Sequence, residues 1–164
     1  MAVPALFLVL CACVWGFCHV EATPDTLSSL DSSFCHGDLE VIYPQLVIDK
    51  CLIIPEDGKL REKVSTVWKA PQIYFPGAHK GSALKRGQIQ GTTITDYHPP
   101  TPPQKSGFHR YQFMLFEQPP DAPVSLTEQE KSSRGKWGLQ AFVKKFDLGK
   151  PVAALQFLTQ NYKD

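Results

Sequence analysis

Short apolar runs, each ended by a turn residue, follow one another along most of this chain. Many are rich in β-branched or aromatic residues, and Pro44, Asp49 and Pro55 close the first three. Such runs are typical of β-strands, because branched side chains pack well on a pleated surface and proline ends a hydrogen-bond ladder. The pattern predicts strands over residues 39–43, 46–48, 52–54, 64–68, 89–95, 108–116 and 152–159. The fold is therefore expected to be mainly β.

The predicted strand over residues 108–116 is the longest of these, and it opens from a turn at Gly107. Side chains alternate along a strand, so His109 and Tyr111 share one face while Arg110 points to the other. Beyond Tyr111 both faces are apolar. This pattern predicts a strand that is covered on both sides at one end and open to a cleft at the other, where His109 and Tyr111 lie.

One amphipathic helix is predicted late in the chain. Apolar residues at helical spacing form a stripe on one of its faces: Leu139, Phe142, Val143 and Phe146. Ser133 can cap the start of this helix, and Gly149 followed by Pro151 closes it.

Basic side chains outnumber acidic ones around this helix. Residues 131–150 contain six Lys or Arg and one acidic residue, Asp147. One interpretation is an ordinary solvated helix face. The other is attraction to anionic lipid headgroups, where each basic side chain near the surface adds about 1 kcal/mol.

The N-terminus carries an apolar run from Ala2 to Cys18. Its length suits the hydrophobic region of a secretory signal better than a bilayer span, and Val20 with Ala22 offers small residues at a cleavage site. Residues 1–22 are therefore predicted to be a signal peptide, with an uncleaved anchor as the alternative. The protein is expected to be secreted or to reside in the secretory or endolysosomal lumen.

The remaining chain is predicted to hold a single domain. Residues 23–33 are rich in Ser, Thr and Asp and are interpreted as a flexible leader. Residues 34–164 form the predicted domain, which is long enough for one sizeable core.

Charge and cysteine usage narrow the function classes. The formal net charge of +1 argues against nucleic acid as the main partner. Cleavage after Ala22 leaves Cys35 and Cys51, which are the candidate disulfide in an oxidising compartment and would stabilise the fold by about 3 kcal/mol. The alternatives are two separate thiols or a bond between chains. No metal-ligand spacing and no Cys-x-x-Cys motif occurs in the sequence, so neither a metal nor a cofactor is expected.

Three residues at the start of the 108–116 strand form the candidate binding site. His109 and Tyr111 offer hydrogen-bond donors and acceptors, and Gly107 lets backbone amides approach a bound oxyanion. The alternative is that His109 is a satisfied structural histidine and Tyr111 an ordinary core tyrosine.

Several segments occur in the order and character of one known family. They are Phe75-Pro76-Gly77, Leu84-Lys85-Arg86-Gly87, Tyr97 with Pro99-Pro100, Ser106 to Tyr111, Arg134-Gly135-Lys136-Trp137 and Phe142-Val143-Lys144-Lys145-Phe146. With these segments the chain resembles the phosphatidylethanolamine-binding protein family, most of all its secreted, signal-bearing vertebrate subgroup numbered four. The resemblance covers nearly all of the chain after residue 34.

The resemblance implies an antiparallel β-sheet sandwich with a shallow pocket for phosphate-bearing headgroups. In the family, the pocket joins the histidine and tyrosine that match His109 and Tyr111 to a carboxylate of an Asp-Pro-Asp-Ala-Pro motif and to the histidine of a Trp-x-His strand. Both of these elements are missing between residues 77 and 84, where the family places further strands. The chain therefore resembles a shortened variant that lacks central strands.

Two functions from different classes follow. The first is a secreted, non-enzymatic module that binds phosphatidylethanolamine or another phosphate-bearing headgroup through His109, Tyr111 and Gly107, with at most peripheral membrane contact; kinship adds a role in modulating kinase signalling through a protein partner. The second is a shortened chain without a working pocket, which acts through protein contacts or folds poorly. An enzyme is not expected, because the sequence shows no nucleophile elbow, metalloprotease motif or phosphate loop.

Overall fold

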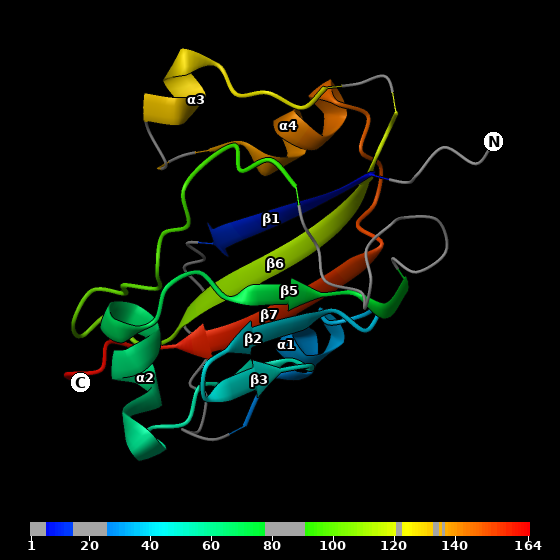
Figure 1. Cartoon of the computed structure of the whole chain (residues 1–164). Coiled ribbons are helices and arrows are strands. Elements are labelled where there is room, and N and C mark those ends of the chain that lie inside the picture. The colour runs from blue at the N-terminus through cyan, green and yellow to red at the C-terminus, as the bar shows by residue number, and fades with distance from the viewer. Residues whose placement is uncertain (1–5, 15–25, 78–90, 121–122, 133–134, 136) are drawn as a thin grey trace.

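Two sheets of unequal size form the frame of the protein (Figure 1). The structure is a computed structural model that describes residues 6–14, 26–77, 91–120, 123–132, 135 and 137–164. The larger sheet has the strand order β1-β6-β7-β4, and the smaller sheet has the order β3-β2-β5. The described chain is mainly β, as the sequence predicts.

The strands of the larger sheet are β1 (Leu6–Val14), β4 (Leu52–Ile53), β6 (His109–Gln118) and β7 (Ala153–Thr159). Those of the smaller sheet are β2 (Glu40–Tyr43), β3 (Leu46–Ile48) and β5 (Gln72–Tyr74). The expected sandwich is antiparallel, and all pairs but one are so: β4 runs parallel to β7. Parallel pairing of two strands requires a long connection, and a long stretch of sequence separates β4 from β7.

The helices are short. They are α1 (Ser29–Ser33), η1 (Asp57–Lys59), α2 (Leu60–Glu62), η2 (Lys63–Val67), α3 (Glu128–Ser132) and α4 (Leu139–Lys145). Figure 1 shows α3 and α4 together at one end of the molecule and α2 near the other. Among the residues with assigned structure, no helix is long and apolar enough to cross a membrane.

The inner core lies between the two sheets. Strand alternation turns every second side chain of β2, β6 and β7 toward it. Its buried members are Leu39, Val41, Tyr43, Ile48, Ile54, Val64, Tyr111, Phe113, Leu115, Ala153, Leu155 and Phe157.

The outer core lies on the opposite face of the larger sheet, where α4 packs. Its buried members are Met114, Phe116, Phe142, Leu148 and Ala154. Strand β6 therefore contributes to both cores beyond Tyr111, which confirms the prediction of a strand covered on both sides at that end.

Helix α4 confirms the predicted amphipathic helix. Phe142 is its buried residue, whereas Lys144 and Lys145 are exposed. The chain turns away from the helix through Gly149, whose φ of +67° is a left-handed conformation that glycine adopts without strain. Ser133, the expected cap, lies outside the described residues.

The strand predicted over residues 64–68 is wrong. Residues Lys63–Val67 form a single π-helical turn, in which the amide of Trp68 donates to the carbonyl of Lys63 at 2.8 Å. Val64 is buried and Thr66 is exposed, so residues two apart do not share a face as a strand requires. Of the strand expected over 89–95, residues 91–95 form no strand and residues 89–90 lie outside the described part.

The beginning of the chain contains two further elements. Within the expected flexible leader, α1 forms after Ser28, whose hydroxyl accepts the amide of Asp31, and Asp31 itself is buried. Within the expected signal peptide, residues 6–14 form β1 against β6. In this segment Ser28 caps a helix and Asp31 binds the distant Arg110, which are roles that short polar side chains often take.

Candidate functional site

The candidate site begins at the turn before β6. The hydroxyl of Ser106 lies 2.6 Å from the carbonyl oxygen of Pro103 and 2.7 Å from Nε2 of His109. A carbonyl oxygen can only accept, so the single hydroxyl proton goes to Pro103 and Nε2–H of His109 donates to Ser106. The turn thus holds the imidazole through a side chain three residues earlier.

Two positive φ angles shape this turn. Lys105 has φ +58° and Gly107 has φ +71°. The amide of Lys105 donates to both carboxylate oxygens of Asp164 at 3.0 Å, which ties the turn to the C-terminal residue. Nothing lies within 4 Å of where a Cβ on Gly107 would sit, so glycine is required here for its backbone conformation and not for lack of space.

His109 is half-buried at the first position of β6, opposite Thr159 of β7. Partial burial lowers the pKa of His109 below its ordinary value of 6.5, because desolvation disfavours the imidazolium. At neutral pH the ring is therefore neutral, with one nitrogen that donates and one that accepts.

Tyr111 lies on the same face as His109 by strand alternation, as predicted, but it lies deeper. Its ring belongs to the inner core, is 8% exposed and stacks on Phe157 with the ring centroids 5.5 Å apart. The site therefore combines the half-buried imidazole of His109, held by Ser106, with a buried tyrosine ring on the same face of β6.

A hollow of about 470 Å³ lies nearby, between the segment before α1 and the strand β4. Its lining residues are Thr26, Leu27, Ser32, Cys51, Leu52, Ile53, Ile54, Pro55 and Arg61. Arg61 connects it to the β6 turn, because its Nε donates to the carbonyl of Ile54 at 3.0 Å and its guanidinium lies 5.3 Å from the Phe108 ring centroid. His109 and Tyr111 are not among its lining residues.

Sequence reasoning missed Arg61. It sits in a charged stretch, and no spacing or motif distinguishes it from the lysines on either side.

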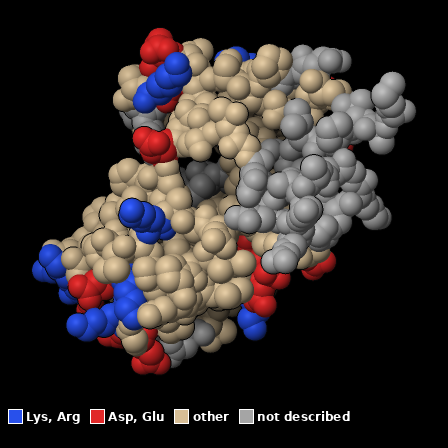
Figure 2. All heavy atoms as spheres, viewed as in Figure 1, with Lys and Arg blue, Asp and Glu red and all other residues tan. Residues whose placement is uncertain are grey.

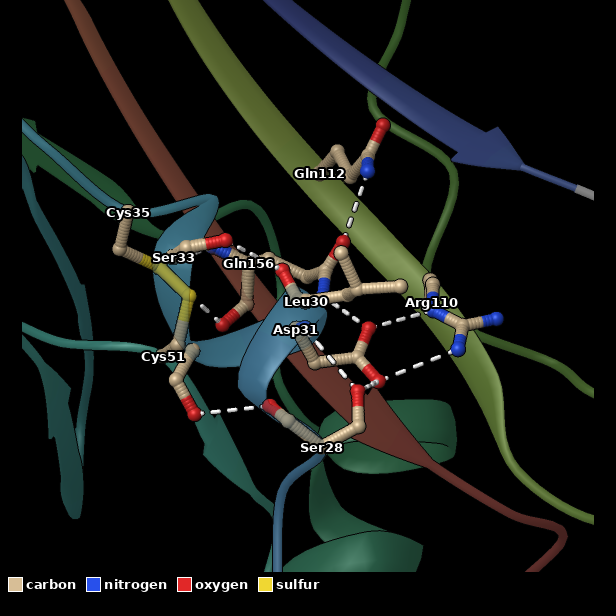
Figure 3. Close-up of polar contacts among 10 residues, drawn as sticks. Ser28, Leu30, Asp31, Ser33, Cys35, Cys51, Arg110, Gln112 and Gln156 are labelled. Carbon is tan, nitrogen blue, oxygen red and sulfur yellow. Dashed lines mark hydrogen bonds and ion pairs between the residues drawn. A yellow bond between two sulfur atoms is a disulfide. The ribbon is translucent and has the colours of Figure 1, made fainter. Parts of the chain in front are cut away.

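A polar cluster around the buried Asp31 and Gln156 lies on the other face of β6, beneath α1 (Figure 3). It comprises Ser28, Asp31, Arg110, Gln112 and Gln156 and is called the polar cluster below. Arg110 holds Asp31 with two nitrogens, Nε to Oδ1 at 2.5 Å and a terminal nitrogen to Oδ2 at 3.1 Å. Gln156 and Ser28 donate to the same carboxylate, and Gln112 donates to Gln156 at 2.7 Å.

The polar cluster joins α1 to the larger sheet through the carboxylate of Asp31. The hydrogen bond from Arg110, aided by those from Ser28 and Gln156, holds the pKa of the Asp31 carboxyl below its usual range even though burial raises it. Arg110 lies on the face opposite His109, as the alternation predicts, and its charge is matched by Asp31. The sequence gives no signal for this pair, because 79 residues separate its members.

Cys35 and Cys51 form a disulfide, with their Cα atoms 5.6 Å apart. Of the three alternatives that the sequence leaves open, the structure has the bond within the chain. It joins the segment after α1 to the start of β4, next to the polar cluster (Figure 3).

The described residues also bear on whether the protein has a metal site or a basic binding surface. In the described ranges, no three His, Cys, Asp or Glu side chains gather as a metal site would require. Figure 2 shows Lys and Arg mixed with Asp and Glu over the face viewed, without one basic patch. This distribution agrees with the near-neutral net charge of +1.

Fold and site define a mainly β protein with two sheets, an intrachain disulfide and a histidine-bearing turn at the start of its longest buried strand. The family model described as phosphatidylethanolamine-binding protein matches residues 53–161, about two thirds of the chain. The chain therefore belongs to the phosphatidylethanolamine-binding protein family.

One relative is a protein of Toxocara canis named "26 kDa secreted antigen". It is 36% identical over 74 residues, which cover 43% of this chain and 28% of the relative. The chain thus aligns with little more than a quarter of that protein's length.

Proposed function

We propose that this chain is a secreted, non-enzymatic protein that binds a phosphate-bearing headgroup, of the phosphatidylethanolamine kind, beside His109 and the turn that precedes it. The observation that carries the proposal is the half-buried imidazole of His109 at the accessible end of β6, held by Ser106. Membership of the family and the name of the secreted relative support the ligand class and the secretory route.

Protonation of His109 is the proposed binding step. A neutral imidazole has one donor nitrogen, which donates to Ser106 here, whereas an imidazolium has two donors and a positive charge. Charge-assisted hydrogen bonds to phosphate are stronger than neutral ones, so protonation favours a bound phosphate. Binding of a phosphate is therefore expected to raise the pKa of His109 and to tighten as the pH falls from 7.5 to about 6.

The proposed roles of the other two site residues are supportive. Gly107 supplies the left-handed backbone that brings the chain into β6, and the buried ring of Tyr111 anchors the same face of the strand through its stacking on Phe157. We assign the first contact with the headgroup to His109.

The non-enzymatic part of the proposal rests on the orientation of Ser106. A nucleophilic serine gives its proton to the adjacent histidine, whereas the hydroxyl proton of Ser106 goes to the carbonyl of Pro103. Ser106 therefore acts as the acceptor that positions His109.

The second candidate function is a chain without a working headgroup pocket, which acts through protein contacts. The observation in its favour is the depth of Tyr111, whose ring is packed against Phe157 where the family would use it at a pocket. A role in modulating kinase signalling is a proposal from kinship and fits either candidate.

We further propose that the chain represents the secreted, signal-bearing subgroup numbered four, and that it is a shortened form that lacks the strands the family places between residues 77 and 84. A longer transcript that contains the intervening strands would support the second statement, whereas a gene without such a segment would refute it.

Thermal unfolding with phosphoethanolamine tests headgroup binding. We expect the secreted protein to melt at a higher temperature with the ligand, and the shift to be larger at pH 6 than at pH 7.5. His109→Ala should abolish the shift. His98→Ala is the matched control, because His98 is an exposed histidine in the preceding loop, and it should leave the shift unchanged.

Equal shifts in the two variants would mean that the ligand binds elsewhere. A cooperative melt with no shift at either pH would refute the headgroup proposal and favour the second candidate.

A further inference from the structure

Strand β6 is paired along both of its edges (Figure 1). One edge pairs with β7, from His109 opposite Thr159 to Leu115 opposite Ala153. The other pairs with β1 over nine residues, from Leu6 opposite Gln118 to Val14 opposite Arg110. The two partners differ in origin, because β7 belongs to the domain whereas β1 belongs to the segment expected to be cleaved.

Cleavage after Ala22 would remove β1 and leave this edge of β6 open. In an antiparallel pair, the amides and carbonyls of roughly every second residue point to one neighbour, so about half of the nine residues would lose their backbone partners. An edge of this length is a template for another strand, and proteins commonly bind extended peptides in this way.

The residues that β1 contacts indicate which kind of strand can bind at this edge of β6. Val9 packs against the inner core and Leu8 packs against the outer core, so the strand is apolar toward both faces of the sheet. A strand with one polar face would place polar groups over one of the two cores, at a cost in desolvation. The fitting strand is therefore extended and, where it lies opposite the two cores, apolar on both faces.

One charged residue, Glu117, favours a particular side chain on the strand that pairs with β6. Glu117 is exposed near the end of β6, and the β1 residue opposite it is Phe7. Opposite charges placed directly across an antiparallel pair are favourable, and like charges are not. A strand with Lys or Arg at the position of Phe7 would therefore bind better than β1 itself.

We propose that, in the secreted protein, the β6 edge vacated by β1 is a docking site for an extended strand of a partner polypeptide that is apolar on both faces where it lies opposite the two cores and basic opposite Glu117. This inference rests on the secretion part of the proposed function and is independent of headgroup binding. The partner adds to the larger sheet antiparallel to β6, in the register that β1 has.

The first measurement is the N-terminus of the protein secreted from cells that express the full chain. Mass spectrometry should find the mature protein beginning at about Thr23, without residues 6–14. A secreted or retained protein that keeps these residues would overturn the proposal, because its own β1 then fills the edge.

The second measurement uses a labelled peptide with the sequence of residues 6–14, the substitution Phe7→Lys and a solubilising C-terminal tag. Fluorescence anisotropy should show saturable binding to the secreted protein. The same peptide with alternate backbone nitrogens methylated is the matched control, because it keeps the side chains and loses the donors. Its affinity should fall about tenfold or more.

A charge reversal distinguishes this register from general stickiness. The Phe7→Glu peptide should bind the native protein more weakly than the Phe7→Lys peptide, and the protein variant Glu117→Lys should reverse the order. Glu117 is exposed, so its substitution is expected to leave the fold intact. An order that does not reverse would overturn the proposed register.

Amide exchange measured by NMR locates the binding strand. The β6 amides that point away from β7 should exchange rapidly in the free secreted protein and be protected by the peptide, whereas those bonded to β7 should stay protected in both. Protection of the first set in the free monomer would overturn the proposal. Protection that appears only with dimer formation would overturn it in favour of a second copy of the chain.

The results of the headgroup test and of the peptide test are independent of each other. Absence of a melting shift with phosphoethanolamine leaves the peptide result intact, and absence of peptide binding leaves the headgroup result intact.

Discussion

The outer face of the larger sheet has two halves, and they are held by different forces. Toward the start of β6, the polar cluster lies beneath α1 and is held by directional bonds to one carboxylate, that of Asp31. Toward the end of β6, the outer core lies beneath α4 and is held by apolar contact. One strand pair, β6 with β7, therefore carries a polar half and an apolar half on a single face.

The difference has a consequence for mutations. In the apolar half, the loss on substitution follows the volume removed, because dispersion and hydrophobic contact are non-directional. In the polar half, the loss depends on which partner is left unmatched, because a stranded charge or amide keeps its desolvation cost. Substitutions in the two halves should therefore differ in the size of the loss and in which second substitution restores stability.

Phe116→Ala should have the largest effect. Phe116 is 2% exposed in the outer core, so its truncation should lower the free energy of unfolding by about 4 kcal/mol. Urea denaturation measures the change. Leu30→Ala is the control, because Leu30 is 83% exposed on α1, and it should cost less than about 0.5 kcal/mol.

Loss of the disulfide should come next. Cys35 and Cys51 are 16 residues apart, and the double variant Cys35→Ser with Cys51→Ser should lower the free energy of unfolding by about 3 kcal/mol, because the unfolded chain is no longer constrained. Thermal denaturation of the two proteins measures this. An unchanged melting temperature would show that the polar cluster alone positions α1 on the sheet.

Asp31→Ala should cost about 2 kcal/mol, because it leaves Arg110 and Gln156 without their shared acceptor. Part of the loss should be recovered in the double variant with Arg110→Met, which removes the stranded charge. Asp49→Ala is the control, since Asp49 is exposed. Additive losses in the double variant would contradict a coupled pair.

The same carboxylate predicts an acid dependence. The pKa of Asp31 is lowered on folding, so its stabilising contribution is present above the unfolded value of 3.8 and is lost as the pH falls through that value toward the folded pKa. Urea denaturation at several pH values should show a shallower acid slope for Asp31→Asn than for the native chain. Identical slopes would place the acid sensitivity in other carboxylates.

The smallest effect is expected at His109. Its pKa is also lowered on folding, but for a cation this means that the folded state favours the neutral ring. Stability should therefore decline as the pH falls below the unfolded value of 6.5 and level off once the pH is below the folded pKa. His109→Gln should remove this decline, whereas the control His98→Gln should retain it.

The local pattern of apolar and polar residues was sufficient to predict those elements whose tertiary contacts favour the same secondary structure. Strands β2, β3, β6 and β7 and helix α4 lie where alternation or a helical stripe predicts them. Pattern failed at Val64, where three β-branched residues indicated a strand. Residues 63–67 follow directly from α2 and continue its helical turn. A helical turn can bury Val64 against the inner core as well as a strand could, so the hydrophobic pattern does not distinguish the two.

The candidate site was predictable in part. The placement of His109 and Tyr111 on one face follows from the period of two along a strand. The depth of Tyr111 does not, because it depends on Phe157 of β7, which lies 46 residues later in the chain and stacks on its ring. Arg61 approaches Phe108 for the same kind of reason, since tertiary packing of segments far apart in the sequence, and not a motif, brings them together.

The sequence by itself determined the mainly β character, the late helix, the candidate cysteine pair and the family resemblance. All of these depend on residue types and on spacings of a few residues, which local sterics and hydrophobic burial convert directly into structure. The tertiary structure alone decided that Asp31 meets Arg110, that Tyr111 is buried, and that an N-terminal segment occupies the edge of β6. Such contacts join residues far apart in the chain, and only the packing of both sheets and their flanking helices selects one partner among many of the same chemistry.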